Sequence, residues 1–295
     1  MILRKASRSA PIFPALSLAI MLAGNPCARA QDSLCTTDGF TMTSGTSPRK
    51  ILAGGMAGGL IVGTMIGSYY EWWYRNHASF HFLHEGWFSD YALGIDKVGH
   101  MFTGYFYFNS VRNFMLWGGF SPSAAFFWAF GMSAMFATTI EIGDGFSSWG
   151  FSPEDVFSDY IGIGYGILQS QSPFLRNFNL KWSYVPDHGY IWPPHITDHY
   201  DFHTYWLAVN VHNLLPESVS GYWPEFLQLA VGYSVADNQT RREGVIGLDF
   251  NLNVFDLHDD TLLLLQKTAS MIHVPAPAVK FSEGKYPAYY LFQLN

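Results

Sequence analysis

Seven ionisable residues in the first half of the chain have the types and spacing of a chemical site: Asp96, Lys97, His100, Glu141, Asp144, Asp155 and Asp159. Two pairs are four residues apart, and Glu141 and Asp144 are three apart, so each pair shares one face of a helix. Five carboxylates meet one lysine and one histidine. Such a cluster must be hydrogen-bonded, partly protonated or neutralised by a cation. Glu141 follows a long uncharged stretch, so we expect it to be buried with Lys97 or His100 as its partner.

Three chemistries fit these residues, and the sequence leaves all three open. A divalent metal ion would suit the oxygen-rich candidate ligands His100, Glu141, Asp144, Asp155 and Asp159. General acid–base hydrolysis would use His100 with Glu141 or Asp144 as catalytic residues. The third interpretation is a structural polar network of all seven residues that fixes the register of the helices. No G-x-S-x-G, Walker, H-E-x-x-H or paired C-x-x-C motif occurs, so nothing indicates a nucleotide, a haem or a standard zinc fold.

Four helices are predicted to position these residues. They cover about 51–74, 96–117, 122–145 and 153–172. The third and fourth follow Ser121-Pro122 and Ser152-Pro153, in which serine caps the helix and proline occupies its first turn. In an up-and-down bundle, the start of the second helix, the end of the third and the start of the fourth lie at the same end. Chain order alone therefore gathers the seven residues at one pole.

The first predicted helix carries glycine at every fourth position. The main row is Gly55, Gly59, Gly63 and Gly67, with Gly54 and Gly58 beside it. Each glycine costs a helix about 1 kcal/mol relative to alanine, so the pattern is worthwhile only where another backbone approaches closely. We favour close packing inside the bundle. The alternative is a membrane dimerisation stripe, which would make the protein a homo-oligomer.

Seven of the ten other histidines gather in two aromatic stretches. The first holds His77, His81 and His84, and the second holds His188, His195, His199 and His203. Prolines and aromatics between the histidines favour loops over helices. A metal-binding loop is one interpretation of the stretch 188–203. We favour a solvated aromatic loop that covers the junction between the two halves of the chain.

The whole chain is predicted to be an α+β protein with an N-terminal, glycine-rich four-helix bundle and a smaller, mainly antiparallel β domain. The expected segments are a signal peptide (1–30), a flexible leader (31–48), the helical domain (49–172) and the β domain (178–295). Period-two alternation predicts strands over 179–184, 204–211 and 245–254, with a closing strand over 286–294. An amphipathic helix is expected over 260–272. Four strands are too few for an outer-membrane barrel.

Export is predicted from the first 30 residues. Basic residues are followed by an apolar core over 11–24 and by Ala28-Arg29-Ala30, the small-x-small pattern of a cleavage site. Cys27 lacks the context of a lipid-attachment cysteine, and after cleavage Cys35 alone remains, which excludes a disulfide framework within one chain. The formal charge is −7, and the mature chain would hold 12 basic against 23 acidic residues. Nucleic acid is therefore excluded as a partner.

The sequence does not decide whether the helices enter a membrane. Residues 51–70 are uncharged and long enough to cross a hydrocarbon core. Arg49 and Lys50 conflict with this, because the positive-inside rule would hold that end inside the cell while a cleaved signal leaves it outside. We expect close association with a membrane.

Three motifs resemble those of the YfiM-like family of predicted periplasmic lipoproteins of unknown function. They are DKVGHMF at 96–102, EIGD at 141–144 and FSPED at 151–155. VanZ-like membrane proteins show a looser similarity. The resemblance implies a helical architecture and an envelope location, and it implies no reaction. The chain departs from the family in lacking a lipidation cysteine and in having Asp159 where the family often has asparagine.

These observations predict an exported protein of the periplasm or cell envelope. We expect a structural or membrane-associated role, with membrane or envelope components as partners. One alternative is a metal-assisted hydrolase or transferase that acts on lipid or cell-wall material. The other is a module that binds a lipid or a small ligand at the junction of the two halves.

Overall fold

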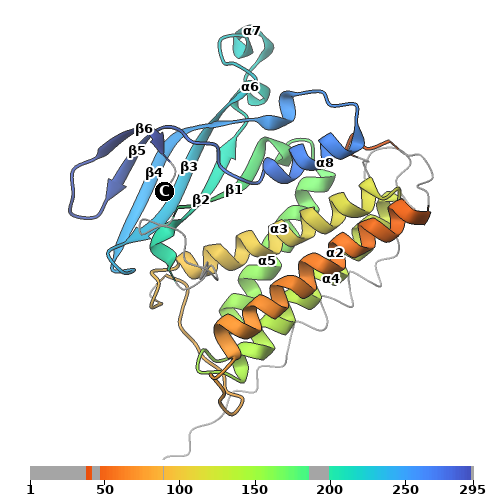
Figure 1. The fold of residues 1–295 in the computed structure, drawn as a ribbon. Helices are drawn as coiled ribbons and strands as arrows, with labels where there is room; N and C mark the ends of the chain where they lie inside the picture. Colours follow the sequence, from red (N-terminus) through yellow and green to blue (C-terminus); the bar gives the residue numbers. More distant parts are fainter. Residues whose placement is uncertain (1–37, 42–46, 89, 186–198, 294–295) are drawn as a thin grey trace, which may run out of the picture.

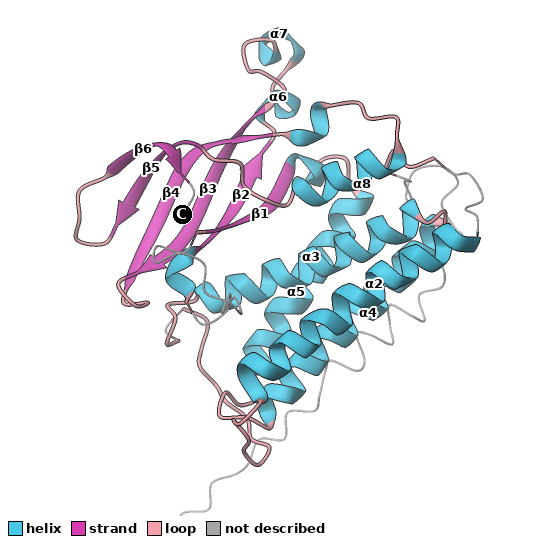
Figure 2. Ribbon diagram, in the orientation of Figure 1, coloured by secondary structure: helices cyan, strands magenta, loops and turns pink. Residues whose placement is uncertain are grey.

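The computed structural model describes residues 38–41, 47–88, 90–185 and 199–293. The predicted signal peptide, most of the leader and both cysteines lie outside the described residues. Helices make up the N-terminal half, and a six-stranded antiparallel sheet makes up most of the C-terminal half (Figure 2). The expected combination of helices followed by an antiparallel sheet is confirmed.

Four long helices carry the first half: α2 (Ser47–Ser68, continued by a π-helical turn, η1, Tyr69–Trp73), α3 (Ile95–Trp117), α4 (Pro122–Gly145) and α5 (Pro153–Gln171). The predicted capping is confirmed at two starts. The Ser121 hydroxyl accepts a hydrogen bond from the Ala124 amide at 3.3 Å, and the Ser152 hydroxyl accepts one from the Asp155 amide at 3.2 Å. These caps fix where the polar residues of α5 begin.

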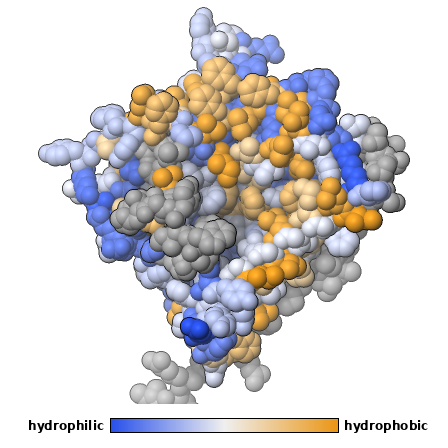
Figure 3. All heavy atoms as spheres, viewed as in Figure 1, coloured by the Kyte–Doolittle hydropathy of each residue, from blue (hydrophilic) through white to orange (hydrophobic). Residues whose placement is uncertain are grey.

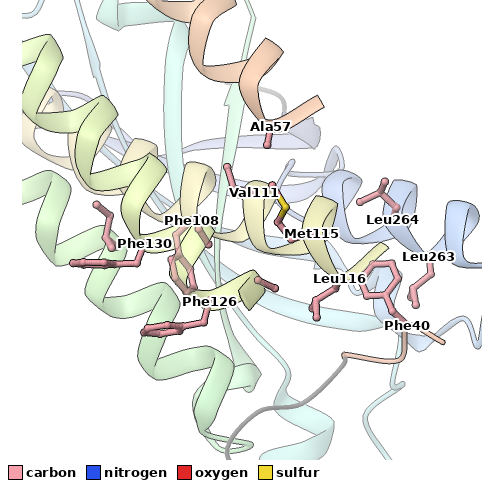
Figure 4. Close-up of a cluster of buried hydrophobic side chains, with 13 residues drawn as sticks. Phe40, Ala57, Phe108, Val111, Met115, Leu116, Phe126, Phe130, Leu263 and Leu264 are labelled. Atoms are coloured by element: carbon pink, nitrogen blue, oxygen red, sulfur yellow. The ribbon is translucent and has the colours of Figure 1, made fainter. Parts of the chain in front are cut away.

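Helix α3 is the centre of the helical half, since it packs against α5, α4 and α2 (Figure 1). Its apolar side chains meet those of α4 in the main core (Figure 4). Phe40, from the segment before α2, and Leu263 and Leu264, from α8 (Asp260–Ala269), complete that core. Residues from both ends of the described chain therefore seal the helical half.

Glycine lets α3 and α5 approach closely. A side chain at Gly104 of α3 would collide with the carbonyl oxygen of Asp159, and one at Gly162 of α5 would collide with the carbonyl oxygen of Met101. At Gly166, a Cβ atom would lie 2.7 Å from the Phe108 ring. These contacts put the backbone of α5 directly against α3, as small residues at a helix interface allow.

The glycine row of α2 does not pack against another helix of the described chain, contrary to our prediction. No atom would meet a Cβ within 4 Å at Gly55, Gly59, Gly63 or Gly67, nor at Gly54 or Gly58. Close packing inside the bundle was the wrong interpretation for this row among the described residues. The helix turns Ala53, Ala57 and Ile61 inward instead, and these three are buried. The glycines consequently form an open stripe.

The sheet has the order β1-β2-β3-β4-β5-β6, so each strand pairs with its neighbours in sequence. Its strands are β1 (Phe178–Tyr184), β2 (His203–Val209), β3 (Leu227–Ala236), β4 (Arg241–Phe250), β5 (Ala276–Ser282) and β6 (Ala288–Gln293). The short helical turn η2 (Leu175–Asn177) precedes β1. Others lie between strands: η3 (Tyr200–Phe202), α6 (Val211–Leu214), α7 (Glu217–Ser220) and η4 (Leu252–Val254).

Strands β3 and β5 were not predicted from the sequence. Gly232 lies inside β3 at a position where a side chain would press on the Trp206 ring. Pro277 lies in β5, where the pairing register shifts between Ala276 and Ala278. Proline is tolerated inside a sheet at such irregularities. Both residues weaken the strand pattern in the sequence and are explained by their neighbours in space.

The start of α3 rests on the first strands of the sheet. The Phe102 ring lies 6.3 Å from Trp182 of β1 and 5.8 Å from Tyr205 of β2, measured between ring centroids. Gly99 faces the Tyr205 hydroxyl. One apolar cluster therefore joins helices and sheet, and it holds the polar beginning of α3 at a fixed distance from the strands.

We expect Gly162→Ala to lower the free energy of unfolding by about 1–3 kcal/mol, because the added methyl group must displace the α3 backbone. The matched control is Gly164→Ala on the same helix, where nothing lies within 4 Å. This control should raise stability by up to about 1 kcal/mol through helix propensity. Denaturant unfolding measures both. Equal effects of the two substitutions would contradict the close approach of α3 and α5.

Candidate functional site

The seven residues singled out by spacing lie together at one pole of the helical half. Asp96, Lys97 and His100 come from the start of α3, Glu141 and Asp144 from the end of α4, and Asp155 and Asp159 from the start of α5. We call this group the polar cluster. Its assembly follows from helix order, as the sequence predicted.

Lys97 lies at the centre of the polar cluster. Its ammonium nitrogen is 2.6 Å from Asp155 Oδ1 and 2.9 Å from Asp96 Oδ2. Two further carboxylates come from the loop before α3: Glu85 Oε2 at 3.0 Å and Asp90 Oδ2 at 3.8 Å. The lysine side chain is 5% exposed. A buried ammonium group surrounded by carboxylates is held by strong, charge-assisted contacts.

His100 joins all three helices. Its Nδ1 lies 3.1 Å from Asp159 Oδ2 on α5 and 3.9 Å from Glu141 Oε1 on α4. Its Nε2 lies 3.7 Å from Asp96 Oδ1, one turn earlier on α3. His100 therefore lies near Glu141, as expected, although this contact is longer than a hydrogen bond. The side chains of Glu141 and Asp159 are nearly inaccessible, whereas the imidazole is 21% exposed.

Neutral groups supply the remaining hydrogen bonds of the carboxylates. Glu141 Oε2 accepts from the Ser152 amide at 3.2 Å, and Asp144 Oδ1 accepts from the indole of Trp73 at 2.7 Å. The Tyr200 hydroxyl donates to Asp96 Oδ1. Tyr200 belongs to η3, so the cluster also ties the helices to the C-terminal half.

Electrostatics favour the charged forms of His100, Lys97 and Asp96, whereas burial raises the pKa of Glu141 to about 9 and so favours its neutral form. Burial alone would lower the pKa of His100, but the carboxylates of Asp155, Asp159 and Asp96 outweigh it and raise that pKa well above its ordinary value. Burial likewise disfavours the charged form of Lys97, yet Asp96 and Asp155 raise its pKa. Burial opposes ionisation of Asp96, whose pKa the positive charges of His100 and Lys97 nonetheless lower.

The cluster forms one wall of a cavity of about 450 Å³. Asp96, His100, Asp144 and Asp155 reach this cavity, and Tyr200 closes it from the side of the sheet. Tryptophan and tyrosine side chains also line the cavity, together with polar side chains that include Glu71 and Arg75. The lining therefore combines acidic and aromatic side chains, as in pockets that hold a ligand through a few polar groups.

Two groups of three side chains have the spacing of a metal site. Asp96, His100 and Asp155 form one, and His100, Glu141 and Asp159 form the other, with ligand atoms within 4.8 Å of one another. Asp144, also predicted as a ligand, belongs to neither group. His100 is common to both, so it is the residue on which a metal centre would depend.

Sequence reasoning missed Glu85, Asp90 and Tyr200. The backbone conformation before α3 gives one local signal, since Gly94 has φ +84° and its amide donates to Asp90 Oδ1 at 2.5 Å. Glycine is the residue that adopts this left-handed conformation without strain. Nothing in the sequence connects Tyr200 with Asp96, more than one hundred residues away.

The histidine-rich stretches do not join the polar cluster within the described residues. His188 and His195 lie outside them. His203 is buried at the start of β2, and its ring stacks on that of Tyr205 with the centroids 5.9 Å apart. In the other stretch, His84 lies 3.3 Å from Glu154. Among described residues, neither stretch contributes to a group with metal-ligand spacing.

A comparison with known families finds a match over this part of the chain. Residues 84–171 match the family model "Predicted periplasmic lipoprotein (DUF2279)". The matched segment contains the whole polar cluster together with Glu85 and Asp90. No curated protein and no solved structure matches. The family match supports export to the periplasm or cell envelope, and the family description assigns no activity.

The stability contributed by His100 should depend on pH. Because its pKa in the folded state lies above the ordinary value of 6.5, the contribution is complete below that pH and is lost as the pH rises through the folded-state pKa. We expect the stability difference between the wild type and His100→Gln to be largest below pH 6.5 and to shrink as the pH rises above it towards the raised folded-state pKa. Denaturant unfolding of both proteins measures it. A difference that stays constant would contradict an imidazolium held by carboxylates.

Proposed function

We propose that this chain is a non-enzymatic envelope protein that lies against a membrane through α2 and α4. The observation that carries the proposal is the exposure of apolar side chains on these helices. Two described segments are long and apolar enough to cross a membrane, Pro48–Trp73 and Pro122–Gly145. Only 22% of the apolar window of the first is buried inside the protein, and 44% of that of the second. A buried core helix would be covered more completely.

The exposed side chains on α2 include Ile51, Leu52, Val62 and Ile66. Hydrophobic side chains follow the strip that α2 occupies (Figure 3). Helix α4 adds Phe127, Trp128 and Met135 to the exposed apolar set. Continuous apolar surfaces of this kind mark contacts with a membrane or another protein. The tyrosines and tryptophans that follow α2, over 69–74, are of the type enriched where lipid meets water.

The open glycine stripe of α2 supports a second copy of this chain as a further partner. Gly55, Gly59 and Gly63 leave the backbone uncovered over successive turns. In lipid, such a small-residue face lets two helices pack closely. The proposed arrangement is a homo-oligomer joined through α2, with Val62 and Ile66 beside the stripe.

The polar cluster would act as the structural lock of this protein. Lys97 and His100 together touch carboxylates of the preceding loop, α3, α4 and α5. Each buried charge has its partner only if these elements keep one position along their axes relative to one another. The network therefore fixes the register of the helices. The motifs shared with the YfiM-like family, and the looser VanZ-like pattern, fall on this same lock.

We expect the double variant Val62→Asp/Ile66→Asp to lose binding to phosphatidylcholine vesicles. Both side chains are more than half exposed, so the fold should survive, while about 3–6 kcal/mol of apolar burial is lost. Vesicle flotation measures the bound fraction. The matched control is Val219→Asp/Tyr222→Asp, on exposed residues at and beside α7. Unchanged flotation of the α2 variant would contradict the proposal.

A metal-assisted hydrolase or transferase on lipid or cell-wall material is the second candidate. The two three-residue groups that share His100 favour it. One of them contains the catalytic candidate Glu141, and Asp144, which lines the cavity, is a further catalytic candidate. The structural lock predicts no stoichiometric divalent ion in the gently purified protein, because Lys97 already supplies a cation. Elemental analysis tests this beside His100→Ala. One ion per chain, lost in the variant, would favour the enzyme.

A further inference from the structure

A second cavity, of about 590 Å³, lies at the junction of the helices and the sheet. Residues of α3, the end of α5, β1 and α8 line it. Helices α3 and α8 lie side by side there (Figure 1). The volume is in the range of sites that hold a small molecule. No residue of the polar cluster reaches this cavity.

Asparagine dominates the lining. Eight of the twelve asparagines in the chain border this one cavity, among them Asn109, Asn113, Asn177, Asn210 and Asn253. They come from elements far apart in the sequence, so their meeting is a product of the fold. Each amide offers both donors and an acceptor, which is what a hydroxyl group requires of its surroundings. The lining is suited to a ligand with several hydroxyl groups.

Part of this amide capacity is not used by the protein. Asn177 Oδ1 accepts from Asn213 Nδ2 at 3.0 Å, and Asn109 Nδ2 donates to the Tyr105 carbonyl at 2.9 Å. Within the described chain, by contrast, no hydrogen bond reaches the side chains of Asn113 and Asn253. Asn113 is also buried. Its amide atoms are not among the fully enclosed polar atoms without a partner, so they face the cavity, where a ligand or water can complete their hydrogen bonds.

The cavity also has a surplus of positive charge. Lys267 and Arg176 line it, with Asp38 as the single acidic lining residue. Asp38 already pairs with Arg112 and lies 3.9 Å from Arg176. Among the residues that the structure describes, no hydrogen bond or ion pair reaches the Lys267 ammonium group. Burial and then the charges of Arg112 and Arg176 lower the pKa of Lys267, although Asp38 opposes them.

We propose that this cavity binds a polyhydroxylated ring that carries one phosphate group, with the asparagine amides on its hydroxyls and Lys267 and Arg176 on its phosphate. The amides match the hydroxyl groups, and the anion would relieve the repulsion between the cations. Charged donors favour phosphate particularly strongly. The inference does not depend on membrane association or on the polar cluster.

The test uses the full chain in detergent solution and calorimetric titration with myo-inositol 1-phosphate. We expect one-to-one binding that is at least tenfold tighter than the binding of either myo-inositol or inorganic phosphate alone. Lys267→Gln and Asn113→Leu should each weaken it at least tenfold. Because the Lys267 ammonium group makes no hydrogen bond or ion pair with the described residues, Lys267→Gln should fold normally, which keeps the test valid if Asn113→Leu does not. The control, Lys285→Gln, replaces an exposed lysine outside the cavity.

Binding to vesicles shows whether the phosphate group belongs to a lipid headgroup or to a soluble compound. Selective binding to phosphatidylinositol over phosphatidylcholine vesicles, reduced by Lys267→Gln, would identify a lipid headgroup. Binding of the free compound without that selectivity would identify a soluble ligand. Absence of binding would overturn the proposal, as would affinity unaffected by Lys267→Gln or equal affinity for inorganic phosphate. Binding to phosphatidylcholine that is lost in the α2 variant reports separately on the membrane proposal.

Discussion

The ammonium group of Lys97 draws carboxylates from three separate parts of the chain to one point: the loop before α3, α3 itself and α5. Buried charges are stable only when they are paired, so each of these elements must arrive at the right height and rotation. His100 extends the same constraint to α4. The cavity beside the cluster and the contact with Tyr200 both depend on this arrangement.

Backbone contact between α3 and α5 is the second constraint, and it reinforces the first. Gly104 and Gly162 allow the two helices to touch, which brings Asp159 within reach of His100 on the neighbouring helix. Wider helix separation would leave Asp159 buried without its partner. Apolar packing and charge pairing therefore require the same geometry, and that agreement is typical of sequences that specify one fold.

The polar end of the helices was predictable because its signals are local. Ser121 and Ser152 mark helix starts, and the spacing of Asp96 and His100 puts both on one face. The packing of the glycine row of α2 was predicted wrongly, because the spacing shows that one side of the helix lacks side chains but not what lies against that side. The asparagine cavity gave no signal at all, since residues such as Asn113 and Asn253 meet only after the sheet has packed on the helices. Strand β5 was not predicted because Pro277 weakens the strand pattern of its sequence.

The core that Phe40, Leu263 and Leu264 close has a consequence for the order of events during export. A chain that crosses a membrane with its N-terminus leading delivers α2 to α5 long before α8. The helical half cannot complete its core until α8 has crossed, after the first four strands of the sheet. During that interval the apolar side chains of the helices are not fully buried, and incompletely formed cores of this kind aggregate readily. Folding of the helical half thus depends on the arrival of α8. A chain that ended before Leu263 would lack the side chains of α8 that complete this core.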